Sequence, residues 1–182
     1  MPMRLRHLAV AAFLLTPCRV RAQAPTDSAP PRANPADVAS LDAIVAALYD
    51  VISGPAGQQR DWNRFRSLFI PGARLIPTGH PPNAAPRTTV LTVDQYADRA
   101  GAGLTRNGFF EHEIGRTTEQ FGAVTQIFSA YESKRAASDP KPFARGINSI
   151  QLFHDGSRWY VVTIFWDSER PDNPIPDKYL KR

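Results

Sequence analysis

One histidine has the side chain and the predicted surroundings that acid–base chemistry needs. His112 falls in a run of strand-forming residues, where it shares a face with Phe110 and Ile114, while Glu111 and Glu113 project the other way. We expect the Phe110 face to be buried, and a histidine among apolar neighbours exchanges protons near neutral pH. The alternative is a core histidine that makes one structural hydrogen bond.

One carboxylate is a second candidate for the same chemistry. Asp167 lies near the end of the last predicted strand and shares a face with Asn148, Thr163 and Phe165. If that face lines a cavity, desolvation raises the pKa of the carboxyl and fits it for proton transfer. The alternative is a solvated aspartate at the end of a strand. His112 and Asp167 are therefore the candidate catalytic residues.

Other side chains are candidates for contact with a bound molecule. Tyr131 shares a face of its strand with Thr125, Ile127 and Ser129. Its hydroxyl is therefore expected either inside a cavity or at the rim. Pockets for small organic molecules combine aromatic and aliphatic walls with a few polar groups. We therefore predict a ligand-binding set made of Tyr131, Asn148, Thr163, Trp62 and Phe165.

Strands in the C-terminal half must position these residues. Strand-forming runs cover residues 109–118, 123–133, 143–154 and 159–169, and Asp155-Gly156 between the last two is a strong hairpin signal. With a turn of even length, Asn148 shares a face with Thr163 and Asp167; a turn of odd length would exchange the faces. Both faces are largely apolar, so we expect helices to cover one and a partner or second layer to cover the other.

Helices are predicted in the N-terminal half. Asn34 and Pro35 open the first, whose apolar residues recur every three or four positions as far as Ile52. Thr92 and Gln95 form a capping box that opens the last. The full prediction is helices over 34–52, 61–69 and 92–104, a short strand over 73–76 and a surface loop over 77–87.

The first residues have the composition of an export signal. A basic start and a short apolar run precede small residues, so we expect a signal peptide over 1–22, cleaved near Ala22, and a periplasmic or secreted product. The alternative is a lipid anchor on Cys18. No run is long enough for a membrane span. Residues 23–34 are rich in proline and are expected to form a disordered tether.

Removal of this leader changes what composition implies. The 182-residue chain has a formal charge of +5, but four of its arginines lie within residues 1–22, and 18 basic against 17 acidic residues remain. We therefore expect no nucleic-acid partner. The single cysteine, Cys18, leaves with the leader, which removes disulfides and thiolate chemistry. The mature histidines, His80, His112 and His154, lack metal-ligand spacing, and no phosphate-binding or nucleophile motif is present, so we expect no metal and no cofactor.

The order of elements resembles a known superfamily. The segments LDAIVAALYDVISG, DWNRFRSLFIPGARLIP, TVDQYADRAGAGL and RGINSIQLFHDGSRWYVVTIFWDSE are similar to those of nuclear transport factor 2-like proteins, including the SnoaL-like and ketosteroid-isomerase-like members. The resemblance implies an α+β cone over residues 35–170, with three helices in the concave face of a strongly bent antiparallel sheet, followed by a polar tail over 171–182. It also implies a hydrophobic cavity and a homodimer through the outer sheet face.

The resemblance implies several functions rather than one. Superfamily members include isomerases, dehydratases, hydrolases and non-catalytic binders, and their catalytic residues differ in position. The expected function is therefore binding of a small organic ligand in the cavity. The alternatives are cofactor-independent isomerisation, dehydration or hydrolysis by cavity His, Asp or Tyr residues, and a non-catalytic module for dimeric assembly or partner binding.

Overall fold

The computed structural model describes residues 30–180, so the expected signal peptide, its cleavage point and Cys18 lie outside the described residues. The described chain has the predicted α+β class. In order, its elements are α1 (Pro35–Val38), α2 (Leu41–Ile52), α3 (Trp62–Ser67), β1 (Phe69–Gly79), β2 (Arg87–Thr88), α4 (Val93–Asn107), β3 (Phe110–Phe121), β4 (Val124–Lys134), β5 (Ala144–His154), β6 (Trp159–Ser168) and the 3-10 turn η1 (Asp177–Tyr179).

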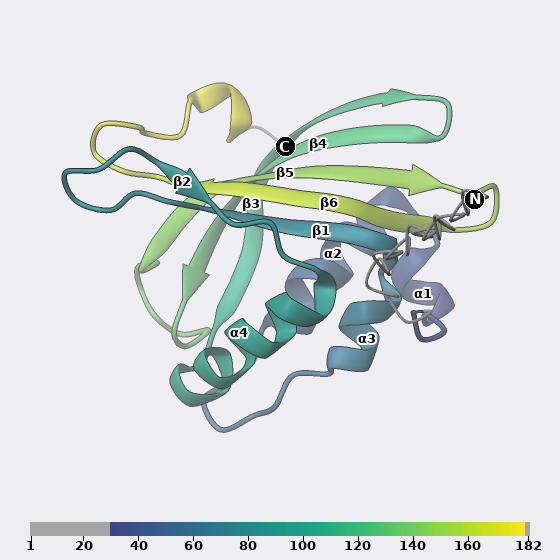
Figure 1. Ribbon diagram of the computed structural model, residues 1–182, viewed down its shortest axis with the longest axis horizontal. Coiled ribbons are helices and arrows are strands. Elements are labelled where there is room, and N and C mark those ends of the chain that lie inside the picture. The colour runs from purple at the N-terminus through teal and green to yellow at the C-terminus, as the bar shows by residue number, and fades with distance from the viewer. Residues whose placement is uncertain (1–29, 181–182) are drawn as a thin grey trace, which may run out of the picture.

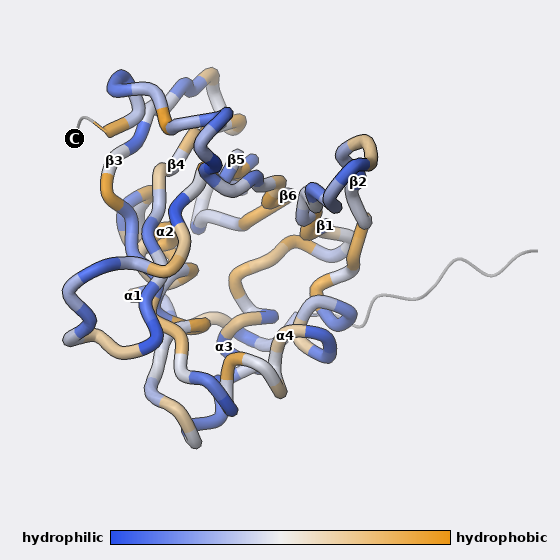
Figure 2. The backbone as a smooth tube through the Cα atoms, turned by 90° about the vertical axis from the view of Figure 1, so that its left-hand side faces the viewer, coloured by the Kyte–Doolittle hydropathy of each residue, from blue (hydrophilic) through white to orange (hydrophobic). Residues whose placement is uncertain are grey.

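The strands form a single curved sheet with the order β2-β1-β6-β5-β4-β3. Strands β3 to β6 make the predicted antiparallel meander. The sheet as a whole is mixed rather than antiparallel, because β1 pairs in parallel with β6. A parallel pair needs a long crossover connection, and all the intervening elements supply it. Figure 2 shows the strands following one another in an arch with the helices beneath, as expected for a cone.

Side-chain caps decide where the helices begin. The first predicted helix is divided in two, because Ser40 is extended and its hydroxyl accepts a hydrogen bond from the amide of Ala43 at 3.1 Å. Asn34 caps α1 and Asp61 caps α3. The predicted capping box at the start of α4 is confirmed, since Thr92 and Gln95 each accept from the other's amide.

The core lies between α2 and the concave face of the sheet. The apolar stripe predicted for the first helices is buried, with Ile44 and Val45 almost inaccessible to solvent. Ile127 of β4 and Ile150 of β5 face them from the sheet. Ala33, within the segment expected to be a tether, also belongs to the core. None of the helices within residues 30–180 has the length and hydrophobicity that a membrane crossing requires.

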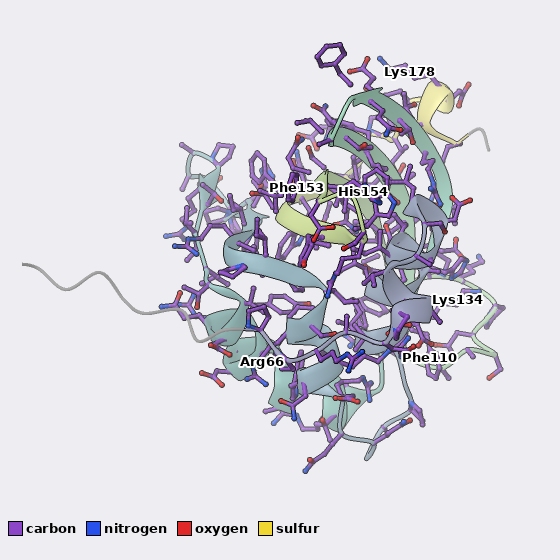
Figure 3. All side chains as sticks on the ribbon, turned by 90° about the vertical axis from the view of Figure 1, so that its right-hand side faces the viewer. Arg66, Phe110, Lys134, Phe153, His154 and Lys178 are labelled. Carbon is purple, nitrogen blue, oxygen red and sulfur yellow. The ribbon has the colours of Figure 1, made fainter. Side chains whose placement is uncertain are left out.

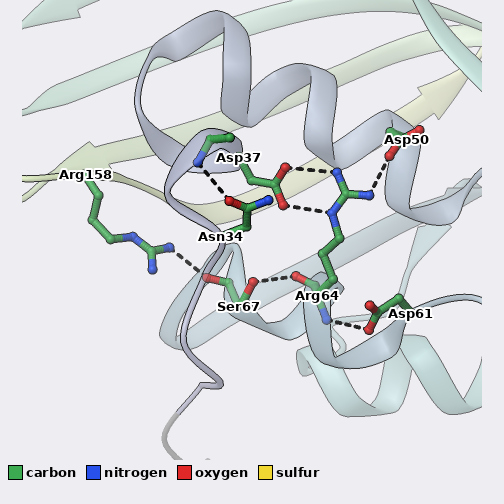
Figure 4. A network of polar contacts seen from close by, with 8 residues as sticks. Asn34, Asp37, Asp50, Asp61, Arg64, Ser67 and Arg158 are labelled. Atoms are coloured by element: carbon green, nitrogen blue, oxygen red, sulfur yellow. Dashed lines mark hydrogen bonds and ion pairs between the residues drawn. The ribbon is translucent and has the colours of Figure 1, made fainter.

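Helix α3 is held to α1 and α2 by a polar network (Figure 4). Arg64 makes two hydrogen bonds to the nearly buried Asp37, at 2.8 and 3.0 Å, and a third to Asp50. These bonds raise the pKa of Arg64, more than offsetting its partial desolvation. Ser67 donates to the carbonyl of Arg64, and Arg158, the residue immediately before β6, donates to the carbonyl of Ser67. The network therefore ties all three N-terminal helices to the sheet.

The chain after β6 packs on the outer face of the sheet, opposite the helices (Figure 1). Ile175 is buried, and the ring of Tyr179 lies 5.4 Å from that of Phe128 in β4. Gly115 of β3 lies so close beneath the main chain of Tyr179 and Leu180 that a Cβ there would clash. The predicted polar tail therefore covers part of the face on which a dimer contact is expected.

Candidate functional site

A cavity of about 120 Å³ lies between the concave face of the sheet and helices α2, α3 and α4. For comparison, an apolar cavity of about 150 Å³ holds benzene. Most of its wall is aliphatic or aromatic, and its polar side chains come from separate elements. The lining residues are Leu48, Tyr49, Ile52, Phe65, Leu75, Tyr96, Phe109, Glu111, Tyr131, Asn148, Ile150, Ile164 and Trp166.

Glu111 is the ionisable carboxyl of this cavity. It lies opposite Ser133 in the β3–β4 ladder, and the Ser133 hydroxyl donates to its Oε2 at 2.6 Å. Burial raises the pKa of Glu111 to about 7, although hydrogen bonds from Ser133 and Asn148 act in the opposite direction. A carboxyl with this pKa is both an effective acid and an effective base at neutral pH.

A chain of hydrogen bonds connects Asn148 to the charged rim of the fold. The Asn148 amide donates to the hydroxyl of Tyr49 at 3.1 Å, and that hydroxyl lies 2.6 Å from the hydroxyl of Ser129. Ser129 in turn donates to Oε1 of Glu113 at 2.6 Å. Burial, followed by the charge of Glu111, raises the pKa of Tyr49. The phenol therefore stays neutral at physiological pH.

Two further tyrosines bring hydroxyl groups to the cavity. The ring of Tyr96 stacks on Phe65 at 5.4 Å and meets Trp166 edge-on at 6.1 Å, which fixes its direction. Burial and then the charge of Glu111 raise its pKa. Burial likewise raises the pKa of Tyr131 to about 12, against a hydrogen bond with Ser168. Among the described residues, none is hydrogen-bonded to the hydroxyl of Tyr96.

A glycine allows Tyr131 to take this position. Gly146 is the cross-strand partner of Tyr131, and a Cβ at Gly146 would lie 2.5 Å from the tyrosine hydroxyl and clash with the carbonyl of Asp167. The ring therefore crosses β5 at the one position where no side chain intervenes. Tyr131 and Asn148, both predicted to contact a ligand, do line the cavity.

The prediction that His112 points into the interior is wrong. Its side chain is 52% exposed and its Nε2 lies 3.2 Å from Glu132, on the outer side of the sheet. Glu111 and Glu113 point inward instead, because their carboxylates find the hydroxyls of Ser133 and Ser129 on the neighbouring strand. Figure 3 shows Phe110 beside Lys134, its ladder partner at this end of the sheet.

The predicted inward orientation of Asp167, Thr163 and Phe165 is also wrong. The turn after His154 has the expected even length, so Trp159 pairs with His154. A β-bulge at Val162 then inserts one residue, which reverses the alternation for the rest of β6. Ile164 and Trp166 line the cavity in place of the three predicted residues.

The pKa of Asp167 is also shifted in the direction opposite to the predicted one. Desolvation acts to raise its pKa, but hydrogen bonds from His80, the amide of Ser168 and Arg170 outweigh it, so the pKa is lowered. His80 Nε2 lies 2.8 Å and Arg170 Nη1 2.9 Å from Oδ1. This ion-pair cluster fastens the loop after β1 to the end of β6. It holds a carboxylate that stays ionised, which is poorly suited to accept a proton near neutral pH.

Trp62 supports the cavity without lining it. Its ring meets Phe65 edge-on at 5.4 Å and packs against Gly101 of α4. Phe65 is the aromatic residue of α3 that reaches the cavity. Within residues 30–180, no group of three or more His, Cys, Asp or Glu side chains is arranged to hold a metal ion.

The residues that the sequence analysis missed are Glu111, Tyr49 and Tyr96. A signal for Glu111 was present, because alternate positions of the next strand carry Ser129, Tyr131 and Ser133. Hydroxyl groups at alternate positions form a polar stripe that suits carboxylates on the neighbouring strand. Tyr49 and Tyr96 lie on helix stripes where an aromatic residue is expected in the core, so their hydroxyls gave no separate signal.

Comparisons with known proteins concern the fold. No family model matches the sequence, and no curated protein matches it significantly. The chain is similar to solved NTF2-like (nuclear transport factor 2-like) proteins of unknown function. One from Silicibacter pomeroyi has 16% identity over 72% of this chain and 94% of that chain, with a TM-score of 0.47. A second, from Methylobacillus flagellatus, has 10% identity over 72% of this chain and 95% of that chain, with a TM-score of 0.46. A third, from Shewanella baltica, has 12% identity over 72% of this chain and 98% of that chain, with a TM-score of 0.44.

Proposed function

We propose that the cavity binds a small, uncharged organic molecule and that Glu111 exchanges a proton with it. The observation that carries this proposal is the carboxyl of Glu111, whose pKa burial raises to about 7 inside a mainly apolar cavity. At neutral pH such a group is present in both protonation states. It can therefore take a proton from one atom of a ligand and return it to another, as isomerisation and dehydration require.

The polar groups around Glu111 suggest how a ligand would be oriented. Tyr96 lines the same cavity, and its hydroxyl makes no hydrogen bond to any residue within 30–180. The hydroxyl is therefore available to donate to a ligand oxygen. A donor at that place would stabilise negative charge that develops on the oxygen when a neighbouring proton leaves. The apolar walls favour a ligand without formal charge, because burial of an unpaired ion is costly.

The ligand hypothesis is tested by screening small carbonyl and hydroxyl compounds by thermal shift, followed by calorimetric titration of any hit. We expect Tyr96→Phe to weaken binding about tenfold, the value of one hydrogen bond to an otherwise unpaired group. Tyr160→Phe, on the outer face of β6, is the matched control. Glu111→Gln should still bind a hit but should lose exchange of the ligand's acidic hydrogen with deuterated solvent. Equal affinities for the Tyr96 and Tyr160 variants would contradict the proposal.

A second candidate function is assembly through the outer sheet face. Phe165 is 46% exposed there, and the stacked rings of Phe153 and Tyr160 lie on the same face of β5 and β6. The tail covers the β3–β4 part of this face, so we infer a contact over β5 and β6 only. Solvent-exposed aromatic residues on one face are typical of protein contacts.

The assembly hypothesis predicts a dimer by sedimentation velocity at micromolar concentration, and a monomer for Phe165→Glu. A buried carboxylate without a partner would cost several kcal/mol at such an interface. Phe121→Glu serves as the control, because Phe121 is 90% exposed at the tip of the β3–β4 hairpin, away from the proposed contact. A monomeric wild-type protein at high concentration would rule out assembly of this kind.

A further inference from the structure

We propose that Glu113 is a positioning residue that acts through Ser129 and Tyr49 to hold the Asn148 amide as a donor to Glu111. The inference rests on the proposed function, because it concerns the group proposed to exchange a proton with the ligand. It assigns a role to a carboxylate that lies outside the cavity. The elements involved are β3, β4, α2 and β5, which are brought together only by the fold.

The direction of each hydrogen bond follows from the first. An ionised carboxylate only accepts, so Ser129, 2.6 Å from Oε1 of Glu113, must donate to it. The single hydrogen of the Ser129 hydroxyl is then used, and its oxygen must accept from Tyr49 at 2.6 Å. The Tyr49 hydroxyl donates its single hydrogen to Ser129, so its oxygen accepts from the Asn148 amide nitrogen at 3.1 Å.

The consequence appears at the cavity. Because the nitrogen of the Asn148 amide must face Tyr49, the same NH₂ group has its second hydrogen available to the Glu111 carboxyl, which lines the same cavity. The oxygen and nitrogen of an isolated amide are nearly interchangeable in shape, so packing alone would select the orientation weakly. Glu113, the acceptor at the far end of this hydrogen-bond chain, therefore selects the orientation of the Asn148 amide.

Glu113 is held as an acceptor by an ion pair at the rim. Arg116 contacts its Oε2 through Nε at 2.9 Å and through Nη2 at 2.8 Å. Arg116 also reaches Asp42 of α2 at 2.8 Å. A β-bulge between Glu113 and Gly115 makes this possible, because it turns Arg116 toward the same side of the sheet as Glu113.

The groups that face Glu111 are mostly phenols and paired charges. Its cavity neighbours on β5 and β6 are uncharged. The phenols around it have raised pKa values and stay neutral, and Glu113 is paired with Arg116. The titratable groups that share the cavity with Glu111 are Tyr49 of α2, Tyr96 of α4 and Tyr131 of β4. Glu111 also lines a second, more open pocket, whose charged and titratable groups are Asp42 and Asp50 of α2, His112, Glu113 and Arg116 of β3, and Lys134 of β4.

The test measures the pKa of Glu111 by carboxyl ¹³C NMR across a pH titration. Ser129→Ala breaks the chain but keeps the charge of Glu113, and Tyr49→Phe breaks it at the next link. We expect each to raise the pKa of Glu111 by about one unit, a tenfold increase in proton affinity, because the amide loses its fixed direction. Thr125→Val is the matched control, since Thr125 is a buried hydroxyl residue of the same strand whose oxygen makes no hydrogen bond.

The outcomes separate this inference from the proposed function. A wild-type Glu111 that titrates near its ordinary value would remove the proposed acid–base role itself. A wild-type value near 7 that is unchanged or lowered in both Ser129→Ala and Tyr49→Phe would overturn the positioning role alone. A rise in both variants, with Thr125→Val unchanged, would support it.

Discussion

Replacing Glu111 by glutamine is expected to stabilise the protein by about 3 kcal/mol at pH 9 and to change its stability little at pH 4. The folded protein holds the Glu111 proton up to a pKa of about 7, whereas the unfolded chain releases it near the ordinary value of 4.5. Between these values the folded state binds more protons, so its stability falls as the pH rises. Above pH 7 the full cost of a buried carboxylate remains, and glutamine avoids it.

Urea unfolding at pH 4, 6 and 9 measures this difference directly. The stability curves of the wild type and the Glu111→Gln variant should meet at acid pH and separate through the range from 4.5 to 7. Glu119→Gln is the control, because Glu119 lies exposed on the same strand. Parallel curves for the wild type and Glu111→Gln would show that Glu111 is ionised normally in the fold, and the proposed proton exchange would lose its basis.

Arg60→Met is expected to destabilise the protein by about 4 kcal/mol, because it leaves four buried or partly buried carbonyls without a donor. Arg60 is only 6% exposed, and its guanidinium donates to the carbonyls of Ile52, Gly54, Gln58 and Leu104 at 2.6 to 3.2 Å. Burial lowers the pKa of Arg60. The side chain joins the C-terminal end of α2 to that of α4, where free carbonyls accumulate.

The effect of Arg60→Met is measured by urea unfolding at pH 7, with Arg99→Met on the exposed side of α4 as the control. Arg60→Lys should recover only part of the loss, since an ammonium group lacks the planar fork that reaches carbonyls in different directions. A loss no larger than that of Arg99→Met would mean that water satisfies these carbonyls in the variant.

Local signals in the sequence predicted the helices of the N-terminal half and the four C-terminal strands, whereas the strand predicted over 73–76 extends over Phe69–Gly79 and β2 was not predicted. Asp155-Gly156 predicted the position of the last hairpin, and Thr92 with Gln95 predicted the start of α4. The parallel pairing of β1 with β6 left no such signal, because it depends on contacts between segments far apart in the chain. The division between α1 and α2 at Ser40 was visible only as a residue type that also occurs inside helices.

The candidate site was predicted as far as the strands stay regular. Asn148 and Tyr131 belong to the β4–β5 ladder, which is regular throughout, and both line the cavity. Asp167 follows the bulge at Val162, and one inserted residue moves every later side chain to the opposite face. The prediction for His112 was wrong for another reason. Its apolar neighbours suggested burial, whereas the carboxylates on either side of it are hydrogen-bonded to Ser129 and Ser133 on the inner face of the sheet. Hydrophobic alternation cannot detect partners of that kind.

The place where the tail crosses β3 has a practical consequence. Gly115 lies directly beneath the backbone of Tyr179 and Leu180, so the end of the described chain forms part of a packed surface (Figure 1). A reporter domain or affinity handle fused after the last residue would pull on that surface and could uncover Phe128. Attachment ahead of Pro30 leaves this contact untouched, and is the better choice for immobilising the protein in binding assays.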